Sequence, residues 1–337
     1  MSKETSSKIR VETSRNLIFF KTVLNLCKKE FEQYHDLGEK ILKEFQGIKK
    51  LKSFKEFKAT YEAKEIPQHP WQYMFYSIHT NEDLSAKPQS VNDMYGPKRQ
   101  ELYEEKICPF FKDIFLESNF KKRYEKRILG EYEEIVKDIQ RVLDKEQPED
   151  ELFEFWGRRD EVDLIFVPDL LRMNGGGGAS RRNKYYTFTG CVHDDEGNIV
   201  FKPSHYISNL LHEYSHSFQK GYTFSSKDIF RKNMGLCEKA FEVIKEEVDE
   251  ELLKTYVSPI NYFEETYIRA IQVFLNKKFW GKRIGEEDME KKAKEKLRRL
   301  EGMGFLRVYD FYNELEKEEG KDPGEIYFGV MEEFKKG

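Results

Sequence analysis

The chain has few cysteines, and none of them is paired in a motif. Its 337 residues include only Cys27, Cys108, Cys191 and Cys237, which are scattered and form no C-x-x-C spacing. Such a spacing would indicate a cysteine-based metal site or a redox centre, so neither is predicted. We expect four free thiols in the reducing environment of the cytoplasm.

Long apolar runs are also missing, and neither sign of charge predominates. No run approaches the roughly 18 apolar residues that would suggest a transmembrane helix, and the polar start, MSKETSSKIRVETSRN, contains no apolar core of a signal peptide. Lys and Arg number 58 against 62 Asp and Glu, which gives a net charge of −4. Composition therefore predicts a cytoplasmic protein with neither nucleic acid nor a membrane as its main partner.

Phosphate-binding glycine motifs are absent as well. Four consecutive glycines occur at Gly175–Gly178, but neither G-x-x-x-x-G-K-[ST] nor G-x-G-x-x-G is present. Without those contexts a glycine run predicts a loop and not a nucleotide site.

The apolar pattern predicts an α+β protein that is mainly helical and has a small mixed sheet. Aromatic residues make up 15% of the chain and must supply much of its core. We expect a helical N-terminal region over residues 1–150 and a second region over 151–337, with the boundary near Pro148. Strands are predicted at Lys8–Thr13, Val162–Pro168, Lys184–Gly190 and Asn198–Lys202.

The most informative stretch is His212-Glu213-Tyr214-Ser215-His216, an H-E-x-x-H pattern within Ser204–Gly221. Two histidines four apart on a helix lie one turn apart on the same face, where both imidazoles can reach one metal ion. The carboxylate next to the first histidine can then act on a water molecule at the metal. The pattern predicts a zinc site with His212 and His216 as ligands and Glu213 as general base.

The surrounding residues predict a helix that directs these histidines away from its core face. An apolar stripe follows the helical repeat through Ile207, Leu210, Leu211, Tyr214 and Phe218. At about 100° per residue, His212 and His216 lie opposite that stripe. Gly221 is expected to end the helix. The alternative is a pair of solvated histidines beside an exposed glutamate.

A third ligand is expected from a downstream helix over Pro259–Phe279, with Ser258 as N-cap, Pro259 as the first helical residue and Gly281 just past the end. Glu264 lies on the apolar face of this helix, where a lone carboxylate is costly. Glu265 lies on the polar face with Arg269, Gln272 and Asn276, and Arg269 is one turn away as a partner. We therefore assign Glu265; an ordinary surface ion pair with Arg269 is the alternative.

Strands followed by an H-E-x-x-H helix and a helix with a glutamate resemble the gluzincin class of zinc metallopeptidases. The segments NLLHEYSHSF and FEETYIRAIQVF are also similar to an uncharacterised family of prokaryotic zincin-like proteins. The resemblance implies a zincin-like fold, Zn²⁺ held by His212, His216 and Glu265, and Glu213 as general base. It also implies that a strand near Lys184–Gly190 forms a sheet edge along which a peptide substrate docks.

The chain departs from better-known gluzincins around the third ligand, where Phe263-Glu264-Glu265 and Arg269 replace their N-E-x-x-x-D form. Four residues are candidates for stabilising the oxyanion: Tyr222, Tyr256, Tyr262 and His205. The predicted function is zinc-dependent hydrolysis of peptide bonds in a peptide or protein substrate. The alternative is a zincin-fold scaffold or interaction protein that binds metal without efficient peptidase activity.

Overall fold

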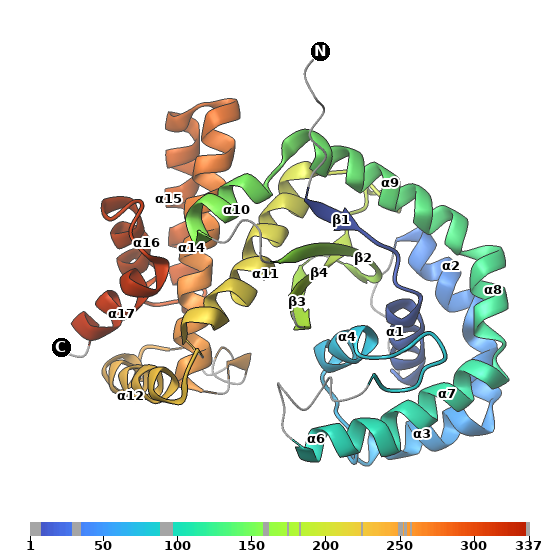
Figure 1. Ribbon diagram of the computed structural model, residues 1–337. Coiled ribbons are helices and arrows are strands. Elements are labelled where there is room, and N and C mark those ends of the chain that lie inside the picture. Colours follow the sequence, from blue (N-terminus) through green and yellow to red (C-terminus); the bar gives the residue numbers. More distant parts are fainter. Residues whose placement is uncertain are drawn as a thin grey trace. The chain divides into compact units, whose positions relative to one another are not determined.

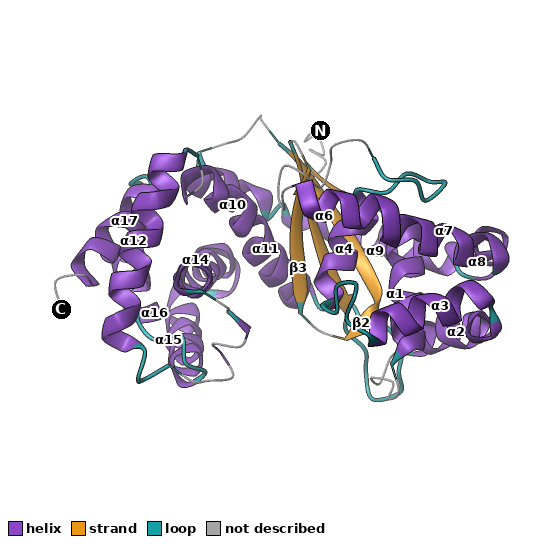
Figure 2. Ribbon diagram, turned by 90° about the horizontal axis from the view of Figure 1, so that it is seen from below, coloured by secondary structure: helices purple, strands orange, loops and turns teal. Residues whose placement is uncertain are grey.

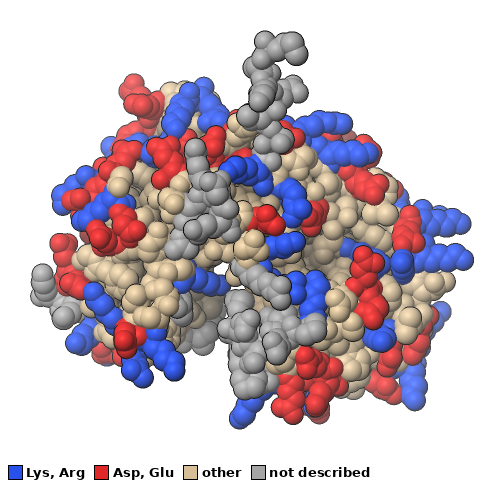
Figure 3. Space-filling model, in the orientation of Figure 1, with Lys and Arg blue, Asp and Glu red and all other residues tan. Residues whose placement is uncertain are grey.

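The computed structural model describes residues 8–28, 35–87, 97–157, 162–173, 175–181, 183–223, 225–248, 252, 255–256 and 258–334. The chain is mostly helical with a small mixed sheet of four strands, as the sequence predicts for an α+β protein. Among the described residues, no helix is both long and apolar enough to cross a membrane. Figure 3 shows Lys and Arg interspersed with Asp and Glu over the visible face, as expected from the near balance of charge.

The chain folds into two compact units whose boundaries differ from the predicted division near residue 150. The first unit consists of Met1–Glu146 and Asp163–Tyr206, and the second of Gln147–Val162 and Ile207–Gly337. The strand-rich segment therefore belongs with the N-terminal helices and not with the H-E-x-x-H helix. The reason is that β1, from the start of the chain, pairs directly with β2.

In the first unit, eight α-helices, one 3₁₀ turn and one π-helical turn accompany the sheet in the part that the structure describes. These are α1 (Arg15–Cys27), α2 (Asp36–Phe45), η1 (Gln46–Lys50), α3 (Lys52–Glu62), α4 (Pro70–Ile78), α6 (Pro97–Leu102), η2 (Tyr103–Ile107), α7 (Cys108–Glu117), α8 (Phe120–Arg127) and α9 (Leu129–Glu146). Figure 2 shows α1, α2, α3 and α7 on one face of the sheet.

The sheet has the strand order β1-β2-β4-β3. Strands β1 (Ile9–Val11), β2 (Asp163–Met173) and β4 (Lys184–Cys191) are parallel, and β3 (Gly176–Arg181) is antiparallel to β4. Three of the four predicted strands are therefore confirmed. The fourth, Asn198–Lys202, is wrong, because this stretch contributes only an isolated bridge between His193 and Ile199.

Two expectations about the middle of the sheet are also wrong. The glycine run does not form a loop, because Gly176 begins β3, where Met74 of α4 packs directly against Gly177. A side chain at that position would collide with Met74 unless the methionine shifted, which is a physical reason for glycine in this strand. Strand β4 is not an edge either, since β2 and β3 flank it.

Packed aromatic rings form the core of the first unit. The rings of Phe20 and Phe111 have centroids 4.1 Å apart, and those of Phe19 and Phe120 are 4.7 Å apart. All four side chains are fully buried, and each contributes about 1.5–3 kcal/mol by leaving water. Lys21 of α1 forms a buried ion pair with Asp169 of β2, which ties this helix to the sheet.

The second unit is helical throughout its described residues. It comprises α10 (Glu149–Trp156), most of α11 (Pro203–Thr223), α12 (Lys227–Ile244), α14 (Pro259–Ile284), α15 (Glu286–Gly302), α16 (Val308–Lys317) and α17 (Pro323–Phe334). Helix α14 is central, because it packs against α10, α12, α15 and α16 (Figure 1). Helices α11 and α14 carry the residues that the sequence assigns to a metal site.

Candidate metal centre

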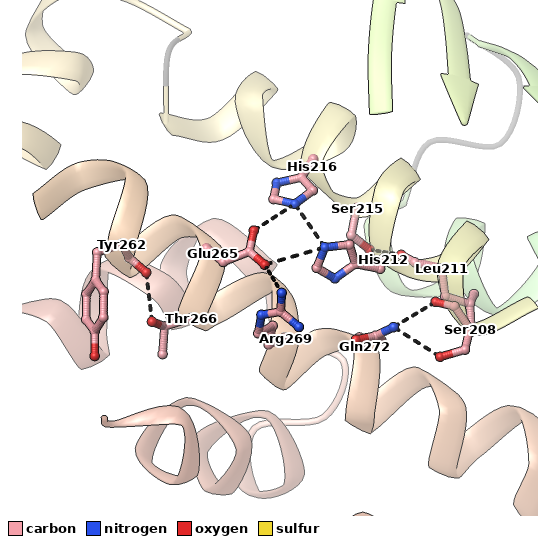
Figure 4. Close-up of polar contacts among 10 residues, drawn as sticks. All are labelled: Ser208, Leu211, His212, Ser215, His216, Tyr262, Glu265, Thr266, Arg269 and Gln272. Atoms are coloured by element: carbon pink, nitrogen blue, oxygen red, sulfur yellow. Dashed lines mark hydrogen bonds and ion pairs between the residues drawn. The ribbon is translucent and has the colours of Figure 1, made fainter. Parts of the chain in front are cut away.

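Helix α11 carries the H-E-x-x-H residues and buries the face that the apolar stripe predicts. Ile207, Leu210, Leu211, Tyr214 and Phe218 are all fully buried. The predicted end at Gly221 is two residues early, since the helix continues to Thr223. Residues of this stripe hold the helix in the core, so its opposite face, with His212 and His216, is directed toward α14 (Figure 4).

Helix α14 begins where the sequence predicts and ends later. The Ser258 hydroxyl caps it by accepting a hydrogen bond from the Asn261 backbone N–H, and Pro259 is the first helical residue. The helix passes through Gly281 and ends at Ile284, before Gly285. Gly285 has φ +107°, a conformation that L side chains rarely adopt, so the chain leaves the helix there and not at Gly281.

Three side chains from these two helices converge on one point. His212 Nε2 lies 3.6 Å from Glu265 Oε1, and His216 Nε2 lies 3.1 Å from Glu265 Oε2. The two imidazole Nε2 atoms are 3.2 Å apart (Figure 4). Among the residues that the structure describes, this is the only group of three His, Cys, Asp or Glu side chains spaced closely enough to hold a metal ion.

This geometry and donor set fit zinc. Ligand atoms about 2.0–2.1 Å from zinc at tetrahedral angles lie about 3.3–3.4 Å from one another. The observed separations of 3.1, 3.2 and 3.6 Å bracket that value. Two imidazoles and one carboxylate are a typical ligand set for a catalytic zinc site, which leaves one position open.

Of the two adjacent glutamates, Glu265 contacts the histidines and Glu264 belongs to a different polar group. Glu264 Oε1 accepts a hydrogen bond of 3.2 Å from Asn233 Nδ2. Asn233 Oδ1 in turn accepts a hydrogen bond from the Tyr327 hydroxyl at 2.9 Å. Burial raises the pKa of Glu264 to about 7. Hydrogen bonds favour the ionised form of this carboxyl on the apolar face, and the charges of His216 and Lys220 act in the same direction.

The charges of the three converging groups depend on one another. Burial lowers the pKa of His212 to about 3, so this imidazole is neutral at pH 7, the form that binds metal. Burial opposes ionisation of Glu265, but the adjacent histidines and Arg269 outweigh it and hold its pKa well below the ordinary value. Burial disfavours the protonated form of His216, but the hydrogen bond to Glu265 and the nearby carboxylate charges outweigh burial, so the pKa of His216 is raised. A metal ion would displace the proton between these two groups.

Arg269 and Tyr256 complete the surroundings of Glu265. Arg269 Nη2 lies 2.7 Å from Glu265 Oε1, and its guanidinium stacks 4.5 Å from the centroid of the Phe305 ring. The hydroxyl of Tyr256 interacts with both Glu265 and Arg269, and burial raises the pKa of this hydroxyl to about 12. Arg269 therefore has the position that the sequence predicts for a partner of the third ligand.

Hydrogen bonds to Ser208, one turn before His212 on α11, connect α11 to α14. Gln272 Nε2 donates to both the backbone carbonyl and the hydroxyl of Ser208, each at 3.0 Å (Figure 4). Asn276 Nδ2 also donates to the Ser208 hydroxyl at 3.2 Å. Gln272 and Asn276 lie on the polar face of α14 that the sequence singled out, whereas Ser208 carried no signal of its own.

The four oxyanion candidates differ clearly in position. The Tyr262 hydroxyl is hydrogen-bonded to the backbone of residues 304–306: it donates to the Gly304 carbonyl and accepts from the Leu306 N–H. The Tyr222 hydroxyl donates to the Trp156 carbonyl at 3.4 Å. His205 belongs to the first unit, where its ring lies 3.2 Å from the Gly190 carbonyl. Of the four, Tyr256 is the one in contact with a residue of the histidine–glutamate group.

Glu213 is buried beside this group, with 8% of its surface exposed. Its charge acts on His216 and Arg269.

The four cysteines take no part, since Cys27, Cys108, Cys191 and Cys237 are buried free thiols. Burial raises the pKa of Cys191 to about 12, which keeps this thiol protonated and unreactive.

Comparison with protein-family models, with curated proteins and with solved structures finds no match to this chain. Function must therefore be inferred from the geometry and chemistry of the site itself.

Proposed function

We propose that this protein is a zinc-dependent hydrolase and that its substrates are peptides or proteins. The observation that carries the proposal is the convergence of His212, His216 and Glu265, whose ligand atoms are separated by 3.1–3.6 Å. When bound, a zinc ion would supply Lewis-acid chemistry, polarising a carbonyl group and making a water molecule more acidic. The zincin-like fold that the resemblance implies is part of this proposal.

Residues of the chain would bind the metal, transfer the proton and stabilise the oxyanion. Neutral His212 and ionised Glu265 present lone pairs toward the same point, and Arg269 keeps the Glu265 carboxylate charged and oriented. Glu213, adjacent to His212, would accept a proton from the attacking water and donate it to the leaving amine. The Tyr256 hydroxyl, which touches Glu265 and Arg269, is the group we assign to stabilise the developing oxyanion.

A structural zinc site in a scaffold or interaction protein is the competing function, and the burial of two ligands favours it. His212 and Glu265 are only 8% and 7% exposed. Structural zinc sites, however, are usually closed by four protein ligands, and this group supplies three. An open fourth position favours catalysis.

Two measurements on the purified full-length protein test the proposal. Elemental analysis should find about one zinc per chain. A peptide library monitored by mass spectrometry should show cleavage that a chelator abolishes and that added zinc restores. Zinc without cleavage in either condition would favour the structural role, and protein without bound metal would overturn both.

A further inference from the structure

One face of α14 carries more polar side chains than a metal ligand and its ionic partner. Glu265, Arg269, Gln272 and Asn276 follow one another at the spacing of helical turns, so they lie along one side of the helix. Gln272 is buried, with 8% of its surface exposed. Burying an amide is unfavourable unless it is hydrogen-bonded, so the partners of this amide indicate its role.

The partner of the Gln272 amide is Ser208 of α11. Gln272 Nε2 donates to both the backbone carbonyl and the hydroxyl of Ser208, each at 3.0 Å. Asn276 Nδ2 donates to the same hydroxyl at 3.2 Å and to the Gln272 backbone carbonyl at 2.7 Å. Two neighbouring amides of α14 therefore hold one residue of α11, within the second unit.

The Ser208 carbonyl is also the helical partner of His212. In an α-helix the carbonyl of one residue accepts the backbone N–H of the residue four positions later. Ser208 and His212 have this spacing within α11. A carbonyl oxygen can accept two hydrogen bonds, so the Gln272 amide and the His212 backbone N–H share one acceptor. Gln272 is thus linked to the first histidine of the site through a single oxygen atom.

This link is placed where the spacing between α11 and α14 is critical. His212 and His216 come from α11 and Glu265 from α14, so the separations of 3.6 and 3.1 Å between them depend on how these two helices are held. Among the described helices, α14 packs most closely on α10, α12, α15 and α16, and α11 approaches it less closely. Functional groups must be held within about 0.5 Å of their productive geometry, so a small slide of one helix along the other would disturb the site.

We propose that Gln272 is a positioning residue for the metal site, and that it fixes His212 relative to Glu265 through the Ser208 carbonyl. Asn276 supports this link by holding the Ser208 hydroxyl and the Gln272 backbone. The inference rests on the metal site of the proposed function and does not require that the protein cleaves peptides.

Metal binding by the purified full-length protein tests the proposal. Gln272→Met keeps the length of the side chain and removes both hydrogen bonds to Ser208. Zinc affinity, measured by competition with a chromogenic chelator, should then fall about tenfold, the lower end of the loss expected when a partner of a metal ligand is removed. The visible spectrum of the Co²⁺-loaded protein, which reports the arrangement of the ligands, should change in the same variant.

Gln140→Met is the matched control, because Gln140 connects two elements of the first unit in a similar way. Its Oε1 accepts the Val11 N–H at 2.8 Å, and its Nε2 donates to the Ile9 carbonyl at 3.0 Å. This variant should lower the free energy of unfolding and leave the zinc affinity and the cobalt spectrum unchanged. An equal fall of zinc affinity in both variants would show that affinity follows stability, and would overturn the positioning role.

Ser208→Ala keeps the test valid if Gln272→Met does not fold. It removes the hydroxyl and leaves the carbonyl, so the zinc affinity should fall by less, about threefold. Zinc affinity equal to that of the unmodified protein, in Gln272→Met or, where that variant does not fold, in Ser208→Ala, would overturn the inference.

The outcomes also separate this inference from the proposed hydrolase activity. Zinc binding that weakens about tenfold in Gln272→Met, without peptide cleavage by the unmodified protein, would support the positioning role and overturn the hydrolase. Cleavage with an unchanged zinc affinity in Gln272→Met would do the reverse. An unmodified protein that binds neither zinc nor cobalt would overturn both.

Discussion

Arg269 lies one helical turn after Glu265 on α14, and its Nη2 is 2.7 Å from the Oε1 that faces His212. Glu265 Oε1 therefore faces both the guanidinium and His212, while Oε2 faces His216. This relationship distinguishes the pair from an ordinary surface ion pair, because the Glu265 side chain is only 8% exposed. A buried carboxylate between two histidines and an arginine is held ionised and in one orientation.

Replacing Arg269 should weaken zinc binding without removing a ligand. We expect Arg269→Met to lower the zinc affinity about 10–100-fold, because the Glu265 carboxylate loses the partner that orients it. Competition with a chromogenic chelator measures this affinity. Arg283→Met, on the same helix but beyond the site, is the control and should bind zinc normally. Unchanged affinity in Arg269→Met would show that the arginine only packs against Phe305.

The two adjacent glutamates should behave differently when removed. Glu265→Ala should lose most of the bound zinc while its far-UV circular dichroism spectrum is retained. Glu264→Ala should keep the metal and lose about 1–3 kcal/mol of unfolding free energy, because Asn233 Nδ2 is left without its acceptor. Metal analysis after dialysis compares both variants directly. Zinc loss in Glu264→Ala alone would reverse the ligand assignment.

Glu213 should be needed for turnover and not for metal binding. Glu213→Gln keeps the size of the side chain but removes its basicity, so zinc should remain near one per chain while kcat falls about 10²–10⁴-fold. Parallel metal analysis and peptide-cleavage kinetics provide the measurement. A variant that cleaves as fast as the unmodified protein would rule out the general-base role.

Acid should destabilise the first unit partly through His79. This side chain is 1% exposed, its ring centroid lies 4.1 Å from that of Phe75, and burial lowers its pKa to about 3. Below pH 6.5 the unfolded chain binds a proton at this imidazole and the folded chain does not, so stability falls as the pH falls toward 3. The contribution lost between pH 7 and pH 5 is about 2 kcal/mol.

His79→Phe should therefore make the unfolding free energy less sensitive to acid by about that amount. Urea unfolding followed by circular dichroism at pH 7 and pH 5 measures the difference. Some acid sensitivity should remain, because burial also lowers the pKa of His35 to about 4. Substitution of the exposed His69 by Phe is the control. The prediction fails if His79→Phe and the unmodified protein lose the same free energy between the two pH values.

Local patterns in the sequence determined the two helices of the candidate site. The stripe from Ile207 to Phe218 requires one face of α11 to be buried, and this leaves His212 and His216 on the other face whatever the rest of the fold does. The same reasoning about polar faces places Glu265, and not Glu264, on the side of α14 that meets the histidines. Ser258 and Pro259 mark the helix start because capping is a contact between close neighbours.

Only the tertiary structure decided where distant segments meet. The glycine run at 175–178 contains no signal for a strand, yet Gly176 and Gly177 are part of β3 because β4 offers a pairing edge, and Met74 packs closely on Gly177. The pairing of β1 with β2 joins residues more than 150 positions apart and assigns the strands to the first unit. The contact of Tyr256 with Glu265 and Arg269 is likewise decided by folding. Burial and hydrogen bonding between remote segments are properties of the folded chain, and no local periodicity encodes them.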